Sequence, residues 1–333
     1  MTFPQREHGS TDAQGPVRWD FSSNANACGP CPQVARAVQQ ADACHYPDPS
    51  YAQLRQALAH LHGVASDRIL LAGSASEWIQ RLTGWAALHR RQSVWWPRHA
   101  YGDYAHAAAA WGLERSHHPS QAALLWLCEP GSPLGQNEDL ASLATLMQHP
   151  HALVALDCAY QPLRLDGSPA LSPSLQSNCW QIWSPNKALG MTGVRAAYVI
   201  APELARTAAM ELDAMAASWP VGSHGVALLM QWSQPEVQDW VRRSLKTLWA
   251  WKTALVHDLI ARGWQCQPSH TPYFCARPPY PLQAEALRAR GVKLRDATSF
   301  GLPGWWRLSA QPDDARLALT EALDALAPTE SHP

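Results

Sequence analysis

The chain has 333 residues, of which 47% are hydrophobic and 16% charged, and its formal net charge is −1. This composition predicts a globular protein with a substantial core and excludes a disordered chain. The near-neutral charge argues against a nucleic-acid or acidic-lipid partner, and no apolar run approaches the roughly 20 residues that span a bilayer, so we expect a cytoplasmic protein.

Helical and strand patterns alternate from residue 50 to residue 202. Leu54, Leu58 and Leu61 recur at helical spacing in a stretch that ends at Gly63. Short apolar strands separated by helices predict a mainly parallel central sheet flanked by helices on both faces, an α/β architecture. The remaining predicted elements are a strand at 68–73, a helix at 76–90, a strand at 92–97, a helix at 101–112, a strand at 122–130, a helix at 137–148, and strands at 151–160, 179–184 and 194–202.

The pattern changes after Pro202. Long helical stretches cover 203–216 and 235–262, and the rest of the chain mixes short apolar runs with helices. This predicts a smaller α+β domain, which the N-terminal segment joins. Its predicted elements are an apolar run at 272–278, a helix at 283–290, runs at 292–300 and 305–310, and a last helix at 313–326.

Polar residues lie at several predicted strand ends, where α/β sheets bind ligands. Ser74 and Ala75 stand between a strand and a helix, and backbone N–H groups at a helix N-terminus suit a phosphate group. Asp157 ends a strand, and a buried carboxylate needs a cationic or hydrogen-bonding partner. The alternatives stay open at this point, because small residues also build tight turns and an aspartate also caps helices.

Lys187 lies between an apolar run and a glycine-punctuated turn, with Arg195 eight residues later. A serine, a lysine and an arginine that converge at strand ends would suit a phosphorylated cofactor, with Ser184 as the serine. A solvated loop lysine is the alternative interpretation of Lys187.

Six stretches in this order resemble the fold-type I pyridoxal-phosphate enzymes of the class I/II aminotransferase family. The resemblance is closest to the histidinol-phosphate aminotransferase branch and its relative, the cobalamin-pathway threonine-phosphate decarboxylase. The stretches are NANACGP (24–30), YPDPSYAQLRQALAHLHGV (46–64), GSASEWI (73–79), DCAY (157–160), SPNKALGMTGVR (184–195) and RDATSFGLPGWWRLS (295–309).

The resemblance implies an aspartate aminotransferase-like fold, the PLP-dependent transferase fold. Residues 1–45 would form an N-terminal arm and substrate-entrance segment, residues 46–216 the large domain that binds pyridoxal 5'-phosphate, and residues 217–333 the small domain. Lys187 would form the Schiff base with the cofactor and move the proton. Asp157 would pair with the ring nitrogen, and Tyr160 would hydrogen-bond the phenolic oxygen of the ring.

The same resemblance implies roles for residues around the cofactor. Tyr101 would stack on the ring, and Tyr46 resembles the tyrosine that reaches the phosphate of a neighbouring subunit, so a homodimer is expected. Ser132 stands where the family usually has an asparagine at the ring oxygen. The residues implied to bind the phosphate are Ser74, Ala75, Ser184 and Arg195, and those implied to bind substrate are Arg307, at its carboxylate, and Asn24 and Asn26, at the entrance.

We therefore expect an aminotransferase that converts a small amino acid, with a polar or phosphorylated side chain, to a 2-oxo acid. A decarboxylase that uses the same apparatus is the first alternative, and a non-catalytic protein that binds the cofactor is the second. We expect no metal. The CGPC sequence at 28–31 leaves a redox role open. The same two cysteines could bind zinc only if Cys44 and His45 completed the site. Arg295 and Asp296 are either a solvated pair or part of the substrate side.

Overall fold

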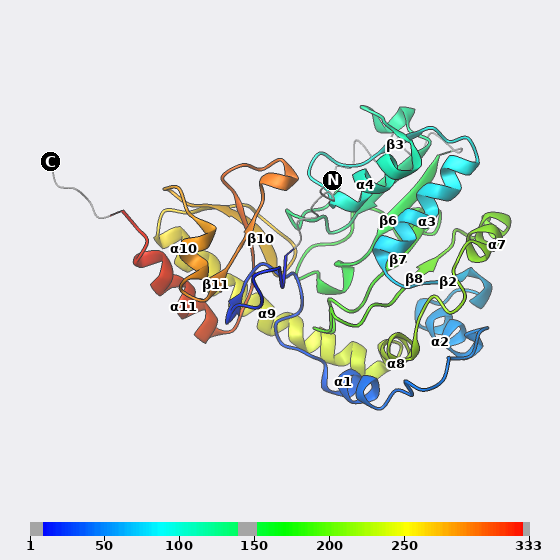
Figure 1. Ribbon diagram of the computed structural model, residues 1–333, viewed down its shortest axis with the longest axis horizontal. Coiled ribbons are helices and arrows are strands. Elements are labelled where there is room, and N and C mark those ends of the chain that lie inside the picture. Colours follow the sequence, from blue (N-terminus) through cyan, green and yellow to red (C-terminus); the bar gives the residue numbers. More distant parts are fainter. Residues whose placement is uncertain (1–8, 139–151, 329–333) are drawn as a thin grey trace.

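A computed structural model describes residues 9–138 and 152–328 (Figure 1). A seven-stranded sheet forms the centre of the larger half, in the order β2-β8-β7-β6-β5-β3-β4. Strand β8 runs antiparallel to β2 and β7, whereas every other neighbouring pair is parallel, as predicted. The strands are β2 (Ile69–Ala72), β3 (Ser93–Trp95), β4 (Glu114–Arg115), β5 (Leu124–Cys128), β6 (Leu153–Asp157), β7 (Trp180–Trp183) and β8 (Ala197–Ile200).

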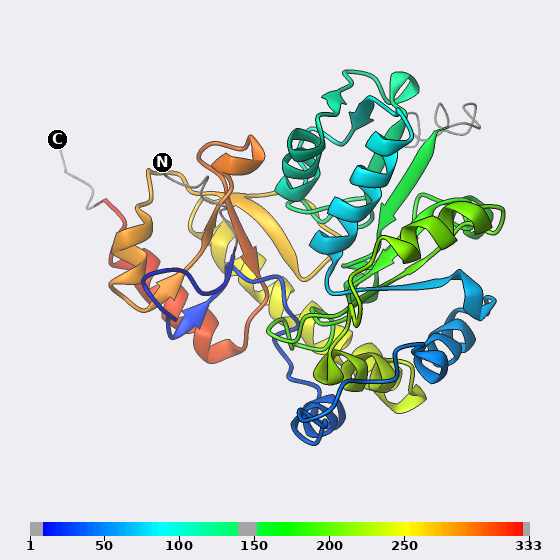
Figure 2. The same ribbon diagram turned by 45° about the vertical axis from the view of Figure 1, so that its right-hand side comes forward.

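Both faces of this sheet are covered, which explains why its strands are apolar at successive positions. In β2, Ile69 and Leu71 belong to one buried cluster, whereas Leu70 and Ala72 belong to another on the opposite face. Helices lie on both sides of the sheet in Figure 2. The helices of this half are α1 (Pro32–Gln39), α2 (Ala52–His62), α3 (Ala75–Leu88), α4 (Gly102–Trp111), α6 (Pro173–Gln176), α7 (Arg206–Ala214) and α8 (Ser223–Trp232).

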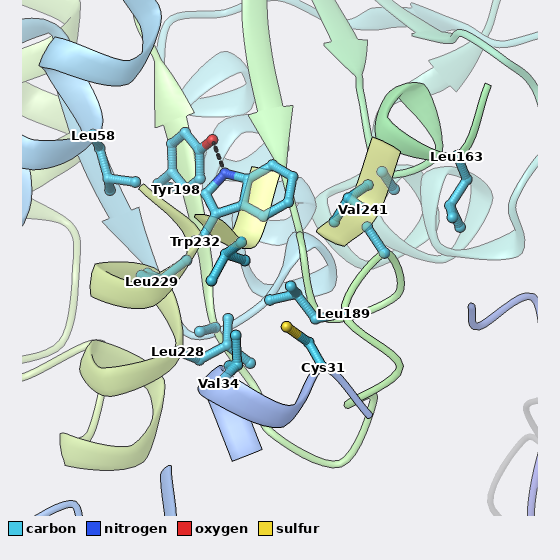
Figure 3. Close-up of a cluster of buried hydrophobic side chains, with 14 of the residues drawn as sticks. Cys31, Val34, Leu58, Leu163, Leu189, Tyr198, Leu228, Leu229, Trp232 and Val241 are labelled. Atoms are coloured by element: carbon cyan, nitrogen blue, oxygen red, sulfur yellow. Dashed lines mark hydrogen bonds between the residues drawn. The ribbon is translucent and has the colours of Figure 1, made fainter. Parts of the chain in front are cut away.

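A cluster of apolar side chains fixes the turn that carries Lys187 (Figure 3). Leu189 of that turn is fully buried and belongs to the same cluster as Val34 of α1 and Leu228 of α8. In the same cluster the Trp232 indole N–H donates to the Tyr198 hydroxyl over 3.0 Å. Because helices from two parts of the chain pack on it, the turn is held by the core rather than exposed as a surface loop.

The smaller half is built on a four-stranded sheet in the order β12-β13-β10-β9. The N-terminal segment joins this half as predicted, because β1 pairs in parallel with β11. The short strands are β1 (Trp19–Asp20), β9 (Gln265–Cys266), β10 (Tyr273–Arg277), β11 (Val292–Lys293), β12 (Arg295–Asp296) and β13 (Trp306–Ser309), and the helices are α9 (Pro235–Ala261), α10 (Ala284–Arg288) and α11 (Asp313–Asp324).

Helix α9, which has 27 residues, runs from one half to the other (Figure 1). Its residues Val237, Val241 and Leu248 pack in the cluster of the larger half, whereas Leu255 and Leu259 pack in that of the smaller half. The domain division after residue 216 therefore stays a prediction. Most of the helix predicted at 137–148 lies outside the described residues, and no helix within them is long and apolar enough to cross a bilayer.

Candidate active site

Lys187 lies in the turn that follows β7, half-buried, with its Nζ 3.5 Å from the Ser184 hydroxyl oxygen. The turn closes at Gly190, which has a φ of 66°, and a Cβ at this position would lie 3.0 Å from the carbonyl oxygen of Asn26. The Asn26 N–H donates to the Lys187 carbonyl over 2.9 Å. The N-terminal segment around Asn26 thus packs directly on the backbone of Lys187.

Asp157 lies at the carboxyl end of β6 and is 4% exposed. Its Oδ1 accepts from the Ala159 N–H over 2.9 Å, and its Oδ2 accepts from the Tyr104 hydroxyl over 3.0 Å. Burial raises the pKa of this carboxyl above its usual value, while the charge of Lys187 and the two hydrogen bonds lower it. A buried acid close to an amine is the arrangement that can hold a second, cationic group.

Tyr160 joins this cluster, because the Lys187 Nζ lies 5.3 Å from the centre of its ring. Its hydroxyl accepts from the Asn24 side-chain amide over 3.2 Å, and the buried Oδ1 of Asn24 has no partner among the described residues. The structure therefore brings together five predicted site residues: Lys187, Asp157, Tyr160, Ser184 and Asn24.

The turn that the sequence predicts to bind the phosphate lies at the start of α3. Ser74 is the N-cap residue, and its side chain accepts from the Glu77 N–H over 3.1 Å, while the Glu77 carboxylate accepts from the Gly73 N–H over 3.3 Å. Ala75 opens the helix, where an N–H has no acceptor within the helix. Ser76 lies in the same turn and has no individual role among the predicted site residues, and its hydroxyl lies 3.1 Å from that of Tyr101 and links this turn to α4.

Arg195 is exposed just before β8 and has no hydrogen bond or ion pair to any described residue. Asn26 is instead fully engaged, since its amide donates to the Ala188 carbonyl and the Ser244 hydroxyl and its oxygen accepts from the Cys28 N–H. Tyr46 lies apart from the cluster. It is 76% exposed and stacks on Trp219 with ring centres 4.3 Å apart.

Arg307 of β13 is buried on the side of the smaller half, 6% exposed. Its Nη1 donates to the Ser132 hydroxyl over 3.2 Å and its Nη2 to the Ser22 carbonyl over 2.8 Å, whereas its Nε has no partner within residues 9–138 and 152–328. No carboxylate of those residues forms an ion pair with it. Burial lowers the pKa of this guanidinium, and the described residues give the buried cation no acidic partner.

Arg295 lies beside Arg307, because the two residues are directly paired in the antiparallel strands β12 and β13. Both guanidinium groups face the Phe300 ring, at 5.2 Å for Arg295 and 5.5 Å for Arg307. Arg295 is only 6% exposed, so it is not the solvated residue that one interpretation of the sequence expected, although Asp296 is exposed. Tyr273 connects this side to the Lys187 cluster, since its ring lies 4.8 Å from that of Tyr160.

A cavity of about 150 Å³ opens next to the Ser132 loop. His99 lines it, and its Nδ1 hydrogen-bonds the Phe300 carbonyl over 2.7 Å, so the cavity adjoins the side of the site where Arg307 lies. Its other lining residues are Pro97, Arg98, Gly131, Leu134, Gln136, Asn137 and Glu138.

The CGPC sequence supports the Lys187 turn, since the Cys31 N–H donates to the Leu189 carbonyl over 2.9 Å. Burial raises the pKa of both Cys28 and Cys31, and both are free thiols, whereas an activated redox cysteine has a lowered pKa. Cys31 is buried and Cys44 is exposed. Among the described residues no group of three acidic, histidine or cysteine side chains could hold a metal ion.

Comparison with known proteins matches residues 18–326 to the family model "Aminotransferase class I and II". The histidinol-phosphate aminotransferase of Jannaschia sp. (strain CCS1) is 27% identical over 322 residues, covering 88% of this chain and 87% of that protein. A histidinol-phosphate aminotransferase from Sinorhizobium meliloti, solved with pyridoxal-5'-phosphate, has a similar structure (TM-score 0.76, 20% identity, 94% of this chain and 93% of that one). So has an L-threonine-O-3-phosphate decarboxylase from Porphyromonas gingivalis (TM-score 0.73, 21% identity, 92% and 98%).

Proposed function

Because this chain belongs to the class I and II aminotransferase family, we propose that it transfers the amino group of a small amino acid with a polar or phosphorylated side chain, using pyridoxal phosphate held by Lys187. The family match and its relatives give the cofactor and the class of reaction: the protein is a pyridoxal-phosphate-dependent aminotransferase. The roles of single residues and the substrate are what we propose.

One observation carries this proposal. The half-buried Lys187 and the buried Asp157 form a cluster that contacts, through Tyr160 and Tyr273, the buried Arg307, which has no acidic partner among the described residues. Uncompensated buried charges are costly, and proteins keep them where a ligand completes them. An amino acid and a cofactor with a basic ring nitrogen would supply the missing charges on the two sides.

The residues present fit pyridoxal phosphate. The buried Asp157 carboxylate suits a protonated ring nitrogen, and Tyr101 offers a flat face at the start of α4. The N–H groups at the start of α3, with the Ser184 hydroxyl and the unpaired Arg195 guanidinium, suit a phosphate dianion. These donors and this acid match the chemical groups of the cofactor one by one.

Bound pyridoxal phosphate supplies an electron sink for negative charge at the substrate Cα. The Lys187 amine is the group that holds the cofactor and then moves the proton at Cα, because the described residues bring no other amine to Asp157 and Tyr160. Asp157 keeps the ring nitrogen positively charged, and Tyr160 donates to the ring oxygen while Asn24 fixes its hydroxyl. These tasks are positioning and proton transfer.

Arg307 would bind the substrate carboxylate. Two of the five N–H groups of its guanidinium are used by Ser132 and Ser22, which leaves three, including the unpartnered Nε, for an anion. Arg295 lies opposite Arg307 in the antiparallel pair of β12 and β13, and we include in the proposal a preference for a substrate with a second anionic group such as a phosphate ester. The names of the relatives, histidinol phosphate and threonine O-3-phosphate, are consistent with that preference.

We also propose a cytoplasmic homodimer in which Tyr46 reaches the phosphate group in a second copy. Its exposure supports this, because a solvated phenol that stacks on Trp219 is open to contact from a second copy. Light scattering on the purified holoprotein would give twice the chain mass if the proposal holds. A monomeric holoprotein with full activity would contradict it.

The role of Lys187 can be tested by borohydride reduction of the holoprotein followed by peptide mass spectrometry. We expect the cofactor mass on the peptide that contains Lys187, and Lys187→Ala should lose both this adduct and at least about 10³-fold in turnover. Lys252→Ala is the matched control, since burial lowers the pKa of Lys252 to about 8 and makes its amine reactive too. An adduct on Lys252 that persists in Lys187→Ala would refute the assignment.

The substrate is tested by incubating the holoprotein with amino acids, O-phospho amino acids and histidinol phosphate. We expect a carbonyl product and the amine form of the cofactor without CO₂, with the phosphorylated compounds preferred. Release of CO₂ would favour the decarboxylase alternative instead. A cofactor spectrum that no compound changes would favour the non-catalytic binding protein.

A further inference from the structure

Tyr104 has no role in the proposal above, yet it is the only side chain of the described residues that hydrogen-bonds the Asp157 carboxylate. It lies in the first turns of α4 and is fully buried. Its ring stacks on Trp126 of β5 with centres 5.1 Å apart and planes 8° apart, so its hydroxyl has one well-defined direction. A tyrosine ring fixed in this way directs its hydroxyl to the Asp157 carboxylate.

The two hydrogen bonds of Asp157 fall on different oxygens. Tyr104 donates to Oδ2, and the Ala159 N–H donates to Oδ1. Each carboxylate oxygen can accept two hydrogen bonds, so one acceptor position remains on each oxygen. The plane of the carboxylate is therefore fixed from both sides while it keeps the capacity to accept from a further donor.

We propose that Tyr104 is a positioning residue for the cofactor, which orients the buried Asp157 carboxylate and keeps it ionised so that it can hold the protonated ring nitrogen of pyridoxal phosphate. This rests on the proposed role of Asp157. The same helix α4 presents Tyr101 at its N-cap, with its ring edge-on to that of Tyr104 at 5.9 Å. One helix start thus carries both the aromatic face for the ring and the hydroxyl that sets its counter-ion.

The charges around Asp157 explain why a hydroxyl is needed there. Burial and the nearby Asp103 both raise the pKa of Asp157, which favours the neutral acid. A neutral carboxyl group cannot balance a cation. The hydrogen bond from Tyr104 opposes this shift, and burial raises the pKa of Tyr104 itself well above its usual value, so it stays a donor at every working pH. The titratable groups that face Asp157 are Tyr104 and Asp103 of α4, Lys187 of the turn after β7, Cys128 of β5 and Cys158 after β6.

The test compares Tyr104→Phe with Tyr198→Phe. Tyr198 is a matched control, because it is equally buried and its hydroxyl is hydrogen-bonded to His62 and Trp232, with no contact to Asp157. Both variants are loaded with pyridoxal phosphate carrying ¹⁵N in the ring. The ¹⁵N chemical shift, which reports protonation of the ring nitrogen, is followed against pH, and the dissociation constant of the cofactor is measured by equilibrium dialysis.

In Tyr104→Phe we expect the ring nitrogen to lose its proton at least about one pH unit lower than in the wild type, and the cofactor to bind about ten-fold more weakly. In Tyr198→Phe both values should equal those of the wild type. An unchanged titration in Tyr104→Phe would overturn the proposal. If Tyr104→Phe does not fold, 3-fluorotyrosine at position 104 is a stronger donor, and the titration must then move upward.

Asp157→Asn separates this inference from the proposed function. If its ring nitrogen titrates as in the wild type, the role of Asp157 itself is wrong. If Asp157→Asn loses the ring proton but Tyr104→Phe keeps it at the wild-type pH, only the role of Tyr104 is wrong.

Discussion

The two sides of the site satisfy their buried charges in different ways. On the proposed cofactor side, formed by Lys187, Asp157 and Tyr160, the acid has two hydrogen bonds and an amine nearby. On the proposed substrate side, formed by Arg307 and Arg295 around Phe300, the buried Arg307 cation has only neutral oxygens as partners among the described residues. A site for a permanently bound group can be preorganised, with its polar groups already hydrogen-bonded. A site for a substrate that binds and leaves can keep a charge that only the bound substrate balances.

Asp157→Asn should break the cofactor side and give the largest effect. Losing one charge of a buried ion pair costs about 2–5 kcal/mol, so the dissociation constant of pyridoxal phosphate should rise roughly 30- to 4,000-fold. The apoprotein should become more stable near neutral pH. The folded-state pKa of Asp157 is raised, so its contribution to stability is present at low pH and lost as pH rises through that pKa, and an amide avoids this loss.

Equilibrium dialysis and calorimetry of the apoprotein measure the two effects of Asp157→Asn. Tight cofactor binding together with a less stable apoprotein would show that the carboxylate is a structural acid only.

Arg307→Met should break the substrate side and leave the other intact. The KM for the amino acid should rise about 100-fold because a charge-assisted bidentate contact is lost, while cofactor affinity stays within about two-fold. Arg277→Met is the control, since Arg277 lies in the neighbouring strand β10 but is exposed and bonded to Gln265. Steady-state kinetics decide, and equal KM values in the two variants would remove Arg307 from the substrate.

His62 should make the larger half sensitive to acid. Burial lowers its pKa to about 4, so its contribution to stability is present above the unfolded value of about 6.5 and lost as pH falls through 4. Between these values the free energy of unfolding should fall by about 1–3 kcal/mol. In His62→Phe the urea-unfolding free energy should depend less on pH over this window. The same slope in both proteins would mean that another group titrates.

Ser132→Ala should give the smallest effect. It removes one neutral oxygen from Arg307 without removing the charge, so the KM should change by less than about ten-fold. A rise in KM as large as that of Arg307→Met would mean that Ser132 contacts the substrate or the cofactor directly.

The sequence allowed the sheet to be predicted because apolar strand patterns are local, whereas the roles of Lys187, Asp157 and Tyr160 came from the family resemblance and stay predictions. The helix that ends at Gly63 was right because a glycine at a φ of 63° is a local signal. Helices α1 and α8 were not predicted. In α8, Gly225 lies in the first turn, and a glycine is more typical of a loop than of a helix. Tyr104 was missed because it is 53 residues from Asp157, and only the fold decides which tyrosine reaches that acid.

The substrate side was harder to predict for the same reason. The local sequence around Arg295 does not predict that β12 pairs with β13, which places two arginines opposite each other. Burial changes Arg307 from a solvated charge into a cation that has no acidic partner among the described residues, and segments as distant as Ser22 contribute to that burial.

Helix α9 couples the stability of the two halves of the molecule. At about 1.5 Å per residue it is about 40 Å long, and it leaves one core near Leu248 and enters the other near Leu255 without a break. Melting either core would strip apolar cover from the same continuous helix. The protein should consequently lose its structure in a single cooperative step on heating, despite having two sheets.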